Sequence, residues 1–274
     1  MDVSVGADAA GQVMGGVPVF ALGVALAFLV QWVVFIPSYV MRTERYYDLT
    51  GSLTYISVMV FAVASSAYAD ARSMLLLVLV LVWAGRLGTF LFRRVLRSGK
   101  DSRFDELKSS FARFLMTWTL QGLWVSLTLA AALAAVTSQT RAGVDILMLV
   151  GLAAWTAGFS IEVVADYQKS RFRAQPANEG AFISSGLWAL SRHPNYFGEI
   201  VLWTGVALIA LPVLRGWQLA TLVSPVFVYL LLTRVSGIPL LERKAEEKWG
   251  GHEEYEDYKR RTPVLVPWIG RKGG

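Results

Sequence analysis

The feature that most constrains the fold is a series of apolar windows, each close to twenty residues long and almost free of charge. About 20 apolar residues are enough for a helix to cross the hydrocarbon core of a bilayer, which is about 30 Å thick. We therefore predict an all-α, polytopic membrane protein with about seven transmembrane helices. The predicted spans are 18–40, 49–68, 73–95, 112–137, 142–164, 198–214 and 217–236.

The composition supports one membrane domain over residues 1–274. Of the 274 residues 55% are apolar, against about 45–50% in a soluble domain. No polar stretch exceeds about forty residues, and a separate domain usually needs at least about 50. We expect a flexible N-terminus over 1–17 and a cytoplasmic tail over 237–274 that folds back as a helical lid. The chain has no cysteine and two histidines, so we expect no disulfide and no metal site.

Basic residues alternate between the predicted loops. Lys and Arg are frequent around 42–45, 93–113, 169–192 and 243–272, whereas the intervening loops hold only Arg72, Arg141 and Arg215. Basic loops favour the cytoplasmic side. We predict a multi-pass protein of the bacterial inner membrane or endoplasmic reticulum, with the N-terminus outside or lumenal and the C-terminus cytoplasmic. The net charge of +6 is explained by these loops, and we expect no nucleic-acid partner.

The densest group of polar residues lies within 186–205. Arg192, His193, Asn195, Tyr196 and Glu199 occur within eight residues, immediately before an apolar run. Proline is favoured at the first helical position, so Pro194 predicts a helix start with free N–H groups at 195 to 197. Such a start, beside an arginine, suits a phosphate or a carboxylate. The alternative is a membrane-surface turn with a snorkelling arginine and an interfacial tyrosine.

Carboxylates and bases also line the end of the fifth predicted span. Glu162, Asp166, either Lys169 or Ser170, and Arg173 follow helical spacing and can line one face. This pattern indicates a polar pocket with ion pairs, or a helix end that neutralises its own charge.

Two further segments carry polar residues into predicted spans. Asp48 and Tyr55 lie at helical spacing at the start of the second span, where Asp48 is either a functional acid or the N-cap. Arg86 lies deep in the third span and needs an anionic partner or a path to the surface. Arg97 and Lys100 flank Gly99 in a loop that resembles a phosphate-binding turn and also an ordinary basic loop.

Several segments of the chain resemble those of a known family. The run Gly-Leu-Trp-Ala-Leu-Ser-Arg-His-Pro-Asn-Tyr-Phe-Gly-Glu-Ile at 186–200, the Asp-Tyr pair at 166–167 and the Tyr-Glu-Asp-Tyr run at 255–258 are similar to the steroid 5-alpha-reductase family. The segments Asp-Leu-Thr-Gly-Ser-Leu-Thr-Tyr at 48–55 and Trp-x-x-Arg-Leu-Gly at 83–88 resemble its DUF1295 branch. The superfamily also holds sterol reductases and isoprenylcysteine carboxyl methyltransferases.

The resemblance implies an NADPH-dependent oxidoreductase that reduces a conjugated C=C bond in a lipophilic enone, such as a steroid, sterol or isoprenoid-like compound. It implies cofactor positions at Asp166, Arg173, Asn195 and Glu199. Further cofactor contacts are expected at Arg192, His193, Tyr196, Glu242, Arg243 and Tyr255, and at Arg97 and Lys100. Asp48 or Tyr55 is expected to polarise the substrate carbonyl, because the Gln-Glu pair and the tyrosine that hold the carbonyl in the steroid reductases are not found here.

Two alternatives stay open at the level of sequence. The Arg-His-Pro-x-Tyr-x-Gly pattern also fits a methyltransferase that uses S-adenosylmethionine on a lipid-linked acceptor. A non-catalytic membrane scaffold is the other, although a scaffold has no need of so many ionisable residues inside a membrane.

Overall fold

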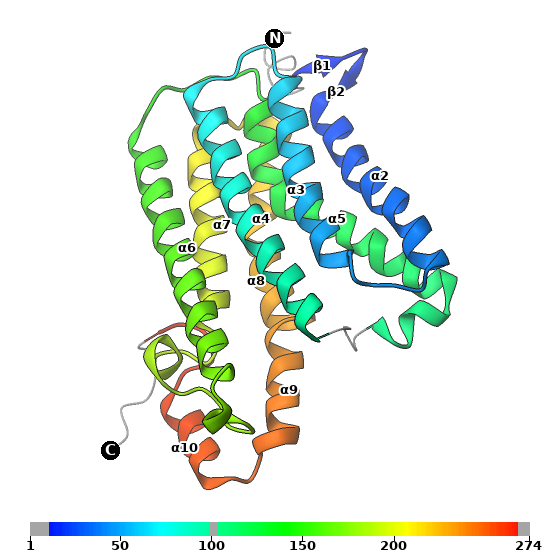
Figure 1. Ribbon diagram of the computed structural model, residues 1–274. Helices are drawn as coiled ribbons and strands as arrows, with labels where there is room; N and C mark the ends of the chain where they lie inside the picture. The colour runs from blue at the N-terminus through cyan, green and yellow to red at the C-terminus, as the bar shows by residue number, and fades with distance from the viewer. Residues whose placement is uncertain (1–10, 99–103, 268–274) are drawn as a thin grey trace. The chain divides into compact units, whose positions relative to one another are not determined.

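A computed structural model describes residues 11–98 and 104–267 of the chain (Figure 1). Its architecture is helical, with one two-stranded antiparallel hairpin formed by β1 (Val13–Met14) and β2 (Val17–Pro18). The α-helices of the described residues are α2 (Val19–Val40), α3 (Tyr47–Ala64), α4 (Ala71–Ser98), α5 (Phe111–Thr137), α6 (Ile146–Arg173), α7 (Pro194–Ala210), α8 (Val223–Leu230), α9 (Ile238–Trp249) and α10 (Glu253–Arg261). The shorter helical turns are η2 (Leu107–Ser109), η3 (Pro176–Asn178), η4 (Gly186–Ala189), η5 (Leu211–Val213), η6 (Gly216–Leu222) and η7 (Leu231–Val235).

The prediction of seven transmembrane helices is confirmed by length and composition. Within the described residues, seven helical stretches are long and apolar enough to cross a membrane. The largest differences from the predicted spans lie at the ends. The seventh stretch runs from Gly216 to Trp249 and so passes the predicted end at 236. The fifth stretch starts at Ile146 and continues to Arg173, and the sixth begins at Pro194. The added residues at the ends of the fifth and seventh stretches are largely polar, so an apolar window could not include them.

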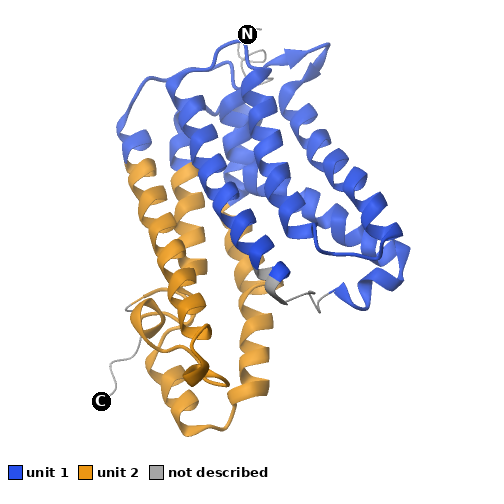
Figure 2. Cartoon of the chain, in the orientation of Figure 1, with its two compact units in different colours: residues 1–149, 207–224 blue, residues 150–206, 225–274 orange. Residues whose placement is uncertain are grey.

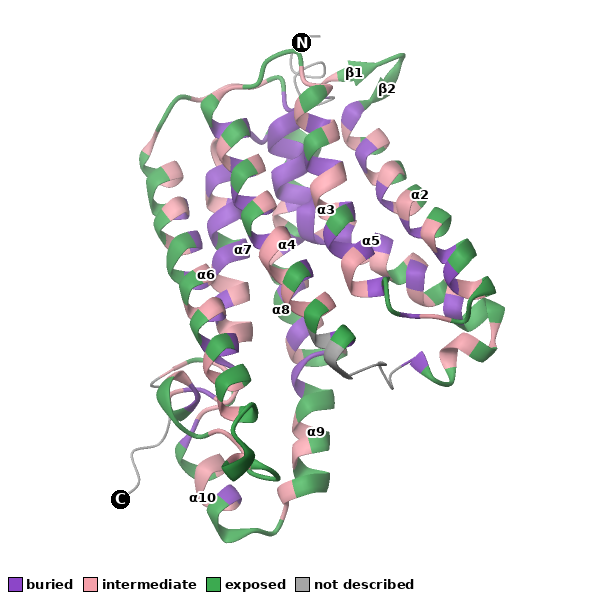
Figure 3. Cartoon of the chain, viewed as in Figure 1, coloured by how far each residue is buried: buried purple, intermediate pink, exposed green. Residues whose placement is uncertain are grey.

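The chain divides into two compact units (Figure 2). Unit 1 comprises Met1–Leu149 and Ala207–Ser224, and unit 2 comprises Val150–Val206 and Pro225–Gly274. In unit 1, α5 packs against α2, α3 and α4, and η5 and η6 also contact it. The C-terminal half of α5 is accordingly buried, with Leu129 to Val136 at most 6% exposed (Figure 3). Small residues dominate this stretch, which lets neighbouring helices approach closely.

One end of unit 1 is held by a polar network. The side chain of Arg72 is 2% exposed and forms an ion pair with Asp145 at 2.7 Å, while its guanidinium also donates to the carbonyl of Gly143. Gln12 donates to Ser66, which joins the start of the described chain to the same region. Residues 13–18 form the β1–β2 hairpin, and the backbone N–H of Gln12 donates to the carbonyl of Thr137 at the end of α5 at 2.8 Å.

In unit 2, α6 and α7 meet at their backbones. A Cβ atom at Gly158 would lie 2.5 Å from the carbonyl oxygen of Gly198, and a Cβ atom at Gly198 would lie 2.5 Å from that of Gly158. One at Gly205 would lie 2.5 Å from the carbonyl oxygen of Gly151. Glycines at such contacts permit the close approach that stabilises helix pairs in lipid. This contact sets the register between the polar residues of the two helices.

The tail of unit 2 folds back on the segment before α7, as a lid-like tail requires. The backbone N–H of Arg192 donates to the carbonyl of Pro263 at 2.9 Å. The hydroxyl of Ser191 donates to the carbonyl of Leu265, and that of Tyr258 donates to the carbonyl of Trp188, each at 2.7 Å. The tail therefore packs directly beside the His-Pro step.

Candidate functional site

The start of α7 is the centre of the candidate site. Pro194 is the first residue of α7, as its sequence predicted. The prediction of a free N–H at Phe197 is wrong, because this group donates to the carbonyl of His193 at 3.1 Å. This is the first hydrogen bond of α7, and it pairs the N–H of Phe197 with the carbonyl four residues earlier. The hydroxyl of Ser191 accepts from the N–H of His193 at 3.1 Å and fixes the turn before the helix.

Glu242 of α9 joins two residues that lie next to each other in the sequence. One carboxylate oxygen contacts Nε2 of His193 at 2.7 Å, and the other pairs with the guanidinium of Arg192 at 2.7 Å. Burial lowers the pKa of His193 below its usual value, although the hydrogen bond to Glu242 opposes that effect. The ring is therefore neutral at pH 7, and its Nε2–H donates to Glu242.

Two buried nitrogen atoms of this cluster lack a protein partner. Among the described residues, neither Nδ1 of His193 nor Nε of Arg192 has a hydrogen-bond partner. His193 is only 4% exposed. Since Nε2 carries the proton, Nδ1 is an acceptor, whereas Nε of Arg192 is a donor. Leaving buried polar atoms without hydrogen bonds costs free energy. Binding of a ligand that donates to Nδ1 of His193 and accepts from Nε of Arg192 would therefore be favourable.

A second polar contact lies between α6 and α7. The amide of Asn195 donates to Asp166 at 3.3 Å. Asp166 is buried, and Glu162, one turn earlier on α6, is 3% exposed. Glu199 lies one turn after Asn195 on α7 and is half-buried. The polar face that sequence spacing predicted for α6 therefore meets the polar face of α7.

The other predicted cofactor residues of unit 2 differ in exposure. The ring of Tyr196 stacks on that of His193, with centroids 5.7 Å apart. Arg173 on α6 and Arg243 on α9 are exposed. Tyr255 is 3% exposed and packs against the rings of Phe182 and Trp249. Its ring is part of the core that holds α10 in place.

Ser191 and Lys169 contribute more than their sequence pattern indicated. Ser191 is fully buried and bonds both His193 and Leu265. A serine three residues before the start of a helix is a signal for such backbone bonding. Lys169 lies over the ring of Trp188, with Nζ 4.2 Å from the ring centroid. A cation–π contact between residues this far apart in the chain leaves no local pattern.

The predicted catalytic residues lie in unit 1, on the face of α3 toward α4. Tyr55 packs edge-on against Trp83 of α4 at 5.0 Å, and a Cβ atom at Gly88 would lie 2.6 Å from Ser52. Asp48 lies in the first turn of α3. The N-cap is Tyr46, so the alternative that Asp48 is the N-cap is wrong. Its carboxylate instead lies where the helix dipole favours negative charge.

Two predicted phosphate contacts cannot be placed. The side chain of Arg97 and the whole of Lys100 lie outside the described residues. Arg86, deep in α4, is half-buried, and its guanidinium lies 5.3 Å from the ring centroid of Phe90.

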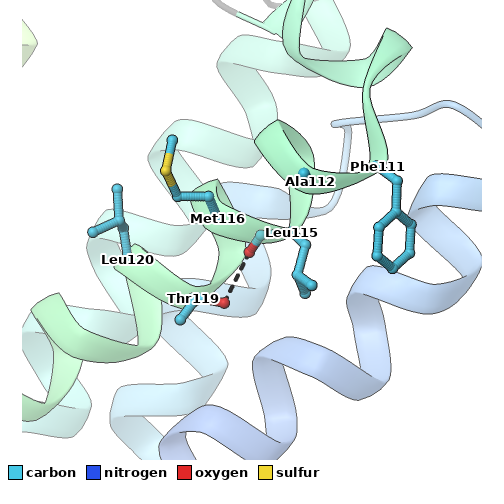
Figure 4. A pocket seen from close by; sticks show the side chains of 6 residues that line it. All are labelled: Phe111, Ala112, Leu115, Met116, Thr119 and Leu120. Carbon is cyan, nitrogen blue, oxygen red and sulfur yellow. Dashed lines mark hydrogen bonds between the residues drawn. The ribbon is translucent and has the colours of Figure 1, made fainter.

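An open groove at the start of α5 offers no comparable chemistry (Figure 4). It measures about 340 Å³ and is lined by Phe111, Ala112, Leu115, Met116, Thr119 and Leu120. The hydroxyl of Thr119 donates to the carbonyl of Leu115 and accepts from Trp32, so its polar atom is already satisfied. This groove has the character of a lipid-facing surface.

A protein-family model matches most of the chain, whereas individual relatives match less than half of it. The model of the family described as protein of unknown function, DUF1295, matches residues 34–262. The chain is 32% identical over 123 residues to 3-oxo-5-alpha-steroid 4-dehydrogenase 1 of Rattus norvegicus, which covers 44% of this chain and 41% of that protein. It is also 32% identical over 123 residues to the protein of the same name from Bos taurus, covering 44% and 42%. The chain thus spans about two fifths of the length of the curated relatives it matches.

No solved structure matches the chain. The family match extends over more than half of the chain and includes α3 to α10, with both the His-Pro step and the tail that returns to it. This chain belongs to the DUF1295 family, with similarity to the steroid 5-alpha-reductases.

Proposed function

We propose that this chain is a membrane oxidoreductase that uses NADPH to reduce a conjugated C=C bond in a lipophilic, steroid-like enone. The name of its relatives describes the dehydrogenation of a 3-oxo-5-alpha-steroid, and reduction of the matching enone is that reaction in reverse. The observation that carries the proposal is the cluster of the buried His193 with the half-buried Arg192 and Glu242, beside the start of α7. Two of its nitrogen atoms have no partner among the described residues, and together they need one donor and one acceptor.

The residues of unit 2 fit such a cofactor by their donor and acceptor types. A ribose hydroxyl would donate to Nδ1 of His193, and a phosphate oxygen would accept from Nε of Arg192. Asn195, Asp166 and Glu199 add an amide and two carboxylates, which suit hydroxyl and carboxamide groups. Arg173 and Arg243 add positive charge for phosphates. Glu242 holds the side chains of His193 and Arg192 in place, and the buried ring of Tyr255 supports α10.

NADPH would supply a hydride to the β-carbon of the enone, which is the cofactor's own chemistry. The chain's part at the substrate would be to donate a hydrogen bond to the carbonyl oxygen. A buried phenol or carboxylic acid can serve, and Tyr55 and Asp48 are the candidates on α3. The apolar helices would solvate the remainder of a lipophilic substrate.

Ligand-dependent melting tests the cofactor. Detergent-solubilised protein is expected to melt at a higher temperature with NADPH, because a ligand that binds only the folded state stabilises it. Asn195→Ala and Glu199→Ala are expected to abolish that shift while the protein still folds. Glu254→Ala, an exposed carboxylate on α10, is the control and is expected to keep the shift. A shift with S-adenosylmethionine and none with NADPH would instead support the methyltransferase alternative.

Turnover tests the donor separately. Tyr55→Phe and Asp48→Asn lie in unit 1 and are expected to keep the NADPH shift. The variant that removes the true donor is expected to lower the rate of reduction of a 3-oxo-Δ4-steroid by about 10²–10⁴-fold. If both variants reduce the steroid at the wild-type rate, neither residue is the donor.

A further inference from the structure

A second pocket lies in unit 2, on a different face of α6 from the candidate cofactor residues. It measures about 570 Å³ and is formed by α6 and the segment that returns from it to η4. Val164, Gln168, Arg171 and Gln175 follow helical spacing along this face. Glu162, Asp166 and Arg173 lie about two residues out of step with them, which places them on nearly the opposite face at 100° per residue. The α6 pocket is therefore separate from the proposed cofactor site.

The lining of the α6 pocket changes from apolar to cationic along the helix axis. Val164 is 43% exposed, Tyr167 is 61% exposed, and Arg171 is exposed one turn further. From Val164 to Arg171 the helix rises about 10 Å. Since α6 begins at Ile146 and about 20 residues cross the hydrocarbon core, residues beyond about 166 reach the headgroup level. Val164 then lies at the depth of acyl chains, Tyr167 at the interface and Arg171 at the depth of phosphates.

The polar groups of the α6 pocket are available for a ligand. Within the described part of the chain, Arg171 forms no ion pair and the hydroxyl of Tyr167 forms no hydrogen bond. None of the residues that line the pocket is acidic. A guanidinium without a carboxylate partner favours an anion, and the absence of acidic lining disfavours a cationic headgroup.

The side chains on either side of Arg171 along the α6 pocket are held in place. The side-chain oxygen of Gln168 accepts from the N–H of Leu187 at 3.0 Å. Gly186 has a φ of +63°, and a Cβ atom there would lie 2.6 Å from the amide nitrogen of Gln168. The positive φ favours glycine at this position. Gln175 is held in turn by the amide of Asn178 at 3.0 Å.

We propose that the α6 pocket binds one anionic phospholipid of the surrounding membrane. The phosphate would accept from Arg171 and Tyr167, and the glycerol region would lie against the amide of Gln168. An acyl chain would follow Val164 and Ile183 toward the bilayer. A soluble phosphate would use only the cationic end of this pocket, whereas a phospholipid uses its whole length.

The test uses the full chain, purified in neutral detergent, with added lipid. Phosphatidylglycerol is expected to raise the melting temperature and to be retained in native mass spectrometry, and phosphatidylcholine with the same acyl chains is expected to do neither. Arg171→Gln is expected to weaken the apparent affinity for phosphatidylglycerol about tenfold, the effect of losing one charge-assisted hydrogen bond. Arg171→Lys, which keeps the charge, is expected to recover most of it. Arg113→Gln, an exposed arginine at the start of α5 in unit 1, is the control of equal charge and is expected to bind as wild type.

The proposal would be overturned by equal stabilisation by the two lipids, by unchanged binding in Arg171→Gln, or by an equal loss in Arg113→Gln. Inorganic phosphate is the further arm, and stabilisation by it equal to that by phosphatidylglycerol would make the pocket a phosphate site and not a lipid site. The NADPH shift is expected to persist in Arg171→Gln, so the lipid site and the cofactor site stand or fall separately.

Discussion

His193 is the residue on which the site most depends. It precedes the proline that begins α7, it bonds Glu242 of α9 through Nε2, and Ser191 fixes its backbone N–H. The ring is buried, which favours its neutral form and lowers its pKa. The charged groups around it are Glu242, Arg192 and Lys169. The carboxylate stabilises the protonated ring, but the two cations and burial outweigh it.

The pKa of His193 predicts a loss of stability in mild acid. Its pKa in the folded chain is below the unfolded value of about 6.5, so the unfolded chain binds the proton more tightly. The contribution of His193 to stability is therefore complete above about pH 6.5 and is lost as the pH falls from there toward the folded value. We expect the apparent melting temperature to fall between pH 7.5 and 5.5.

Two variants attribute this effect to one ring. His193→Gln keeps a donor for Glu242 and removes the titration, so its melting temperature is expected to depend less on pH over this range. His252 is exposed, and His252→Gln is expected to behave as wild type. A wild-type melting temperature that stays constant from pH 7.5 to 5.5 would contradict the neutral, buried ring.

At the scale of elements, the contact between α6 and α7 positions the polar groups. Gly158 and Gly198 touch through their backbones, and the amide of Asn195 reaches Asp166 across the same interface. In lipid, association of helices depends on such close packing, since apolar side chains gain little by leaving the lipid tails. The glycines thus determine the distance at which the two polar faces meet.

Gly158→Ala is expected to destabilise unit 2. The added Cβ atom would lie 2.5 Å from the carbonyl oxygen of Gly198, so the two backbones must separate. We expect a loss of about 1–3 kcal/mol, the usual cost of overpacking, measured as a lower melting temperature. Gly85→Ala in α4 is the control because no heavy atom lies within 4 Å of its added Cβ. Alanine is favoured over glycine in a helix by about 0.5–1 kcal/mol, so this variant is expected to be as stable as wild type or more so. If the melting temperature fell as much in Gly85→Ala as in Gly158→Ala, the loss would not be due to the backbone contact at Gly158.

At the scale of the whole molecule, the two compact units carry different parts of the proposed chemistry. The described candidates for cofactor binding lie in unit 2, and the candidates for carbonyl polarisation lie in unit 1. The boundary between the units falls within α6, α7 and α8, at residues 150, 207 and 225.

The orientation in the membrane is expected from the basic loops, and the chain allows a direct test. It has no cysteine, so single cysteines can be introduced without background. Val144 is 66% exposed in the loop before α6, and Ser109 is exposed at the end of the loop before α5. An impermeant maleimide is expected to label Val144→Cys in intact cells and Ser109→Cys only after lysis. The reverse pattern would place the N-terminus in the cytoplasm.

Much of the architecture was predictable because solubility in hydrocarbon is a local property that adds up along about 20 residues. The start of α7 at Pro194 was predictable for a similar reason, since proline restricts its own backbone and that of the preceding residue. The continuation of α6 to Arg173 was not, because charged residues end an apolar window without ending a helix.

Sequence alone determined the apolar spans, the polar residues that interrupt them and the family to which their pattern belongs. The tertiary structure decided which of those polar residues meet. Glu242 lies 49 residues from His193, and Asp166 lies 29 residues from Asn195. No spacing rule reaches across such separations, because these pairs form only where α9 returns beside the start of α7 and where the glycines bring α6 and α7 into contact. A hydrogen bond depends on distances of about 3 Å, and packing between segments sets distances on that scale.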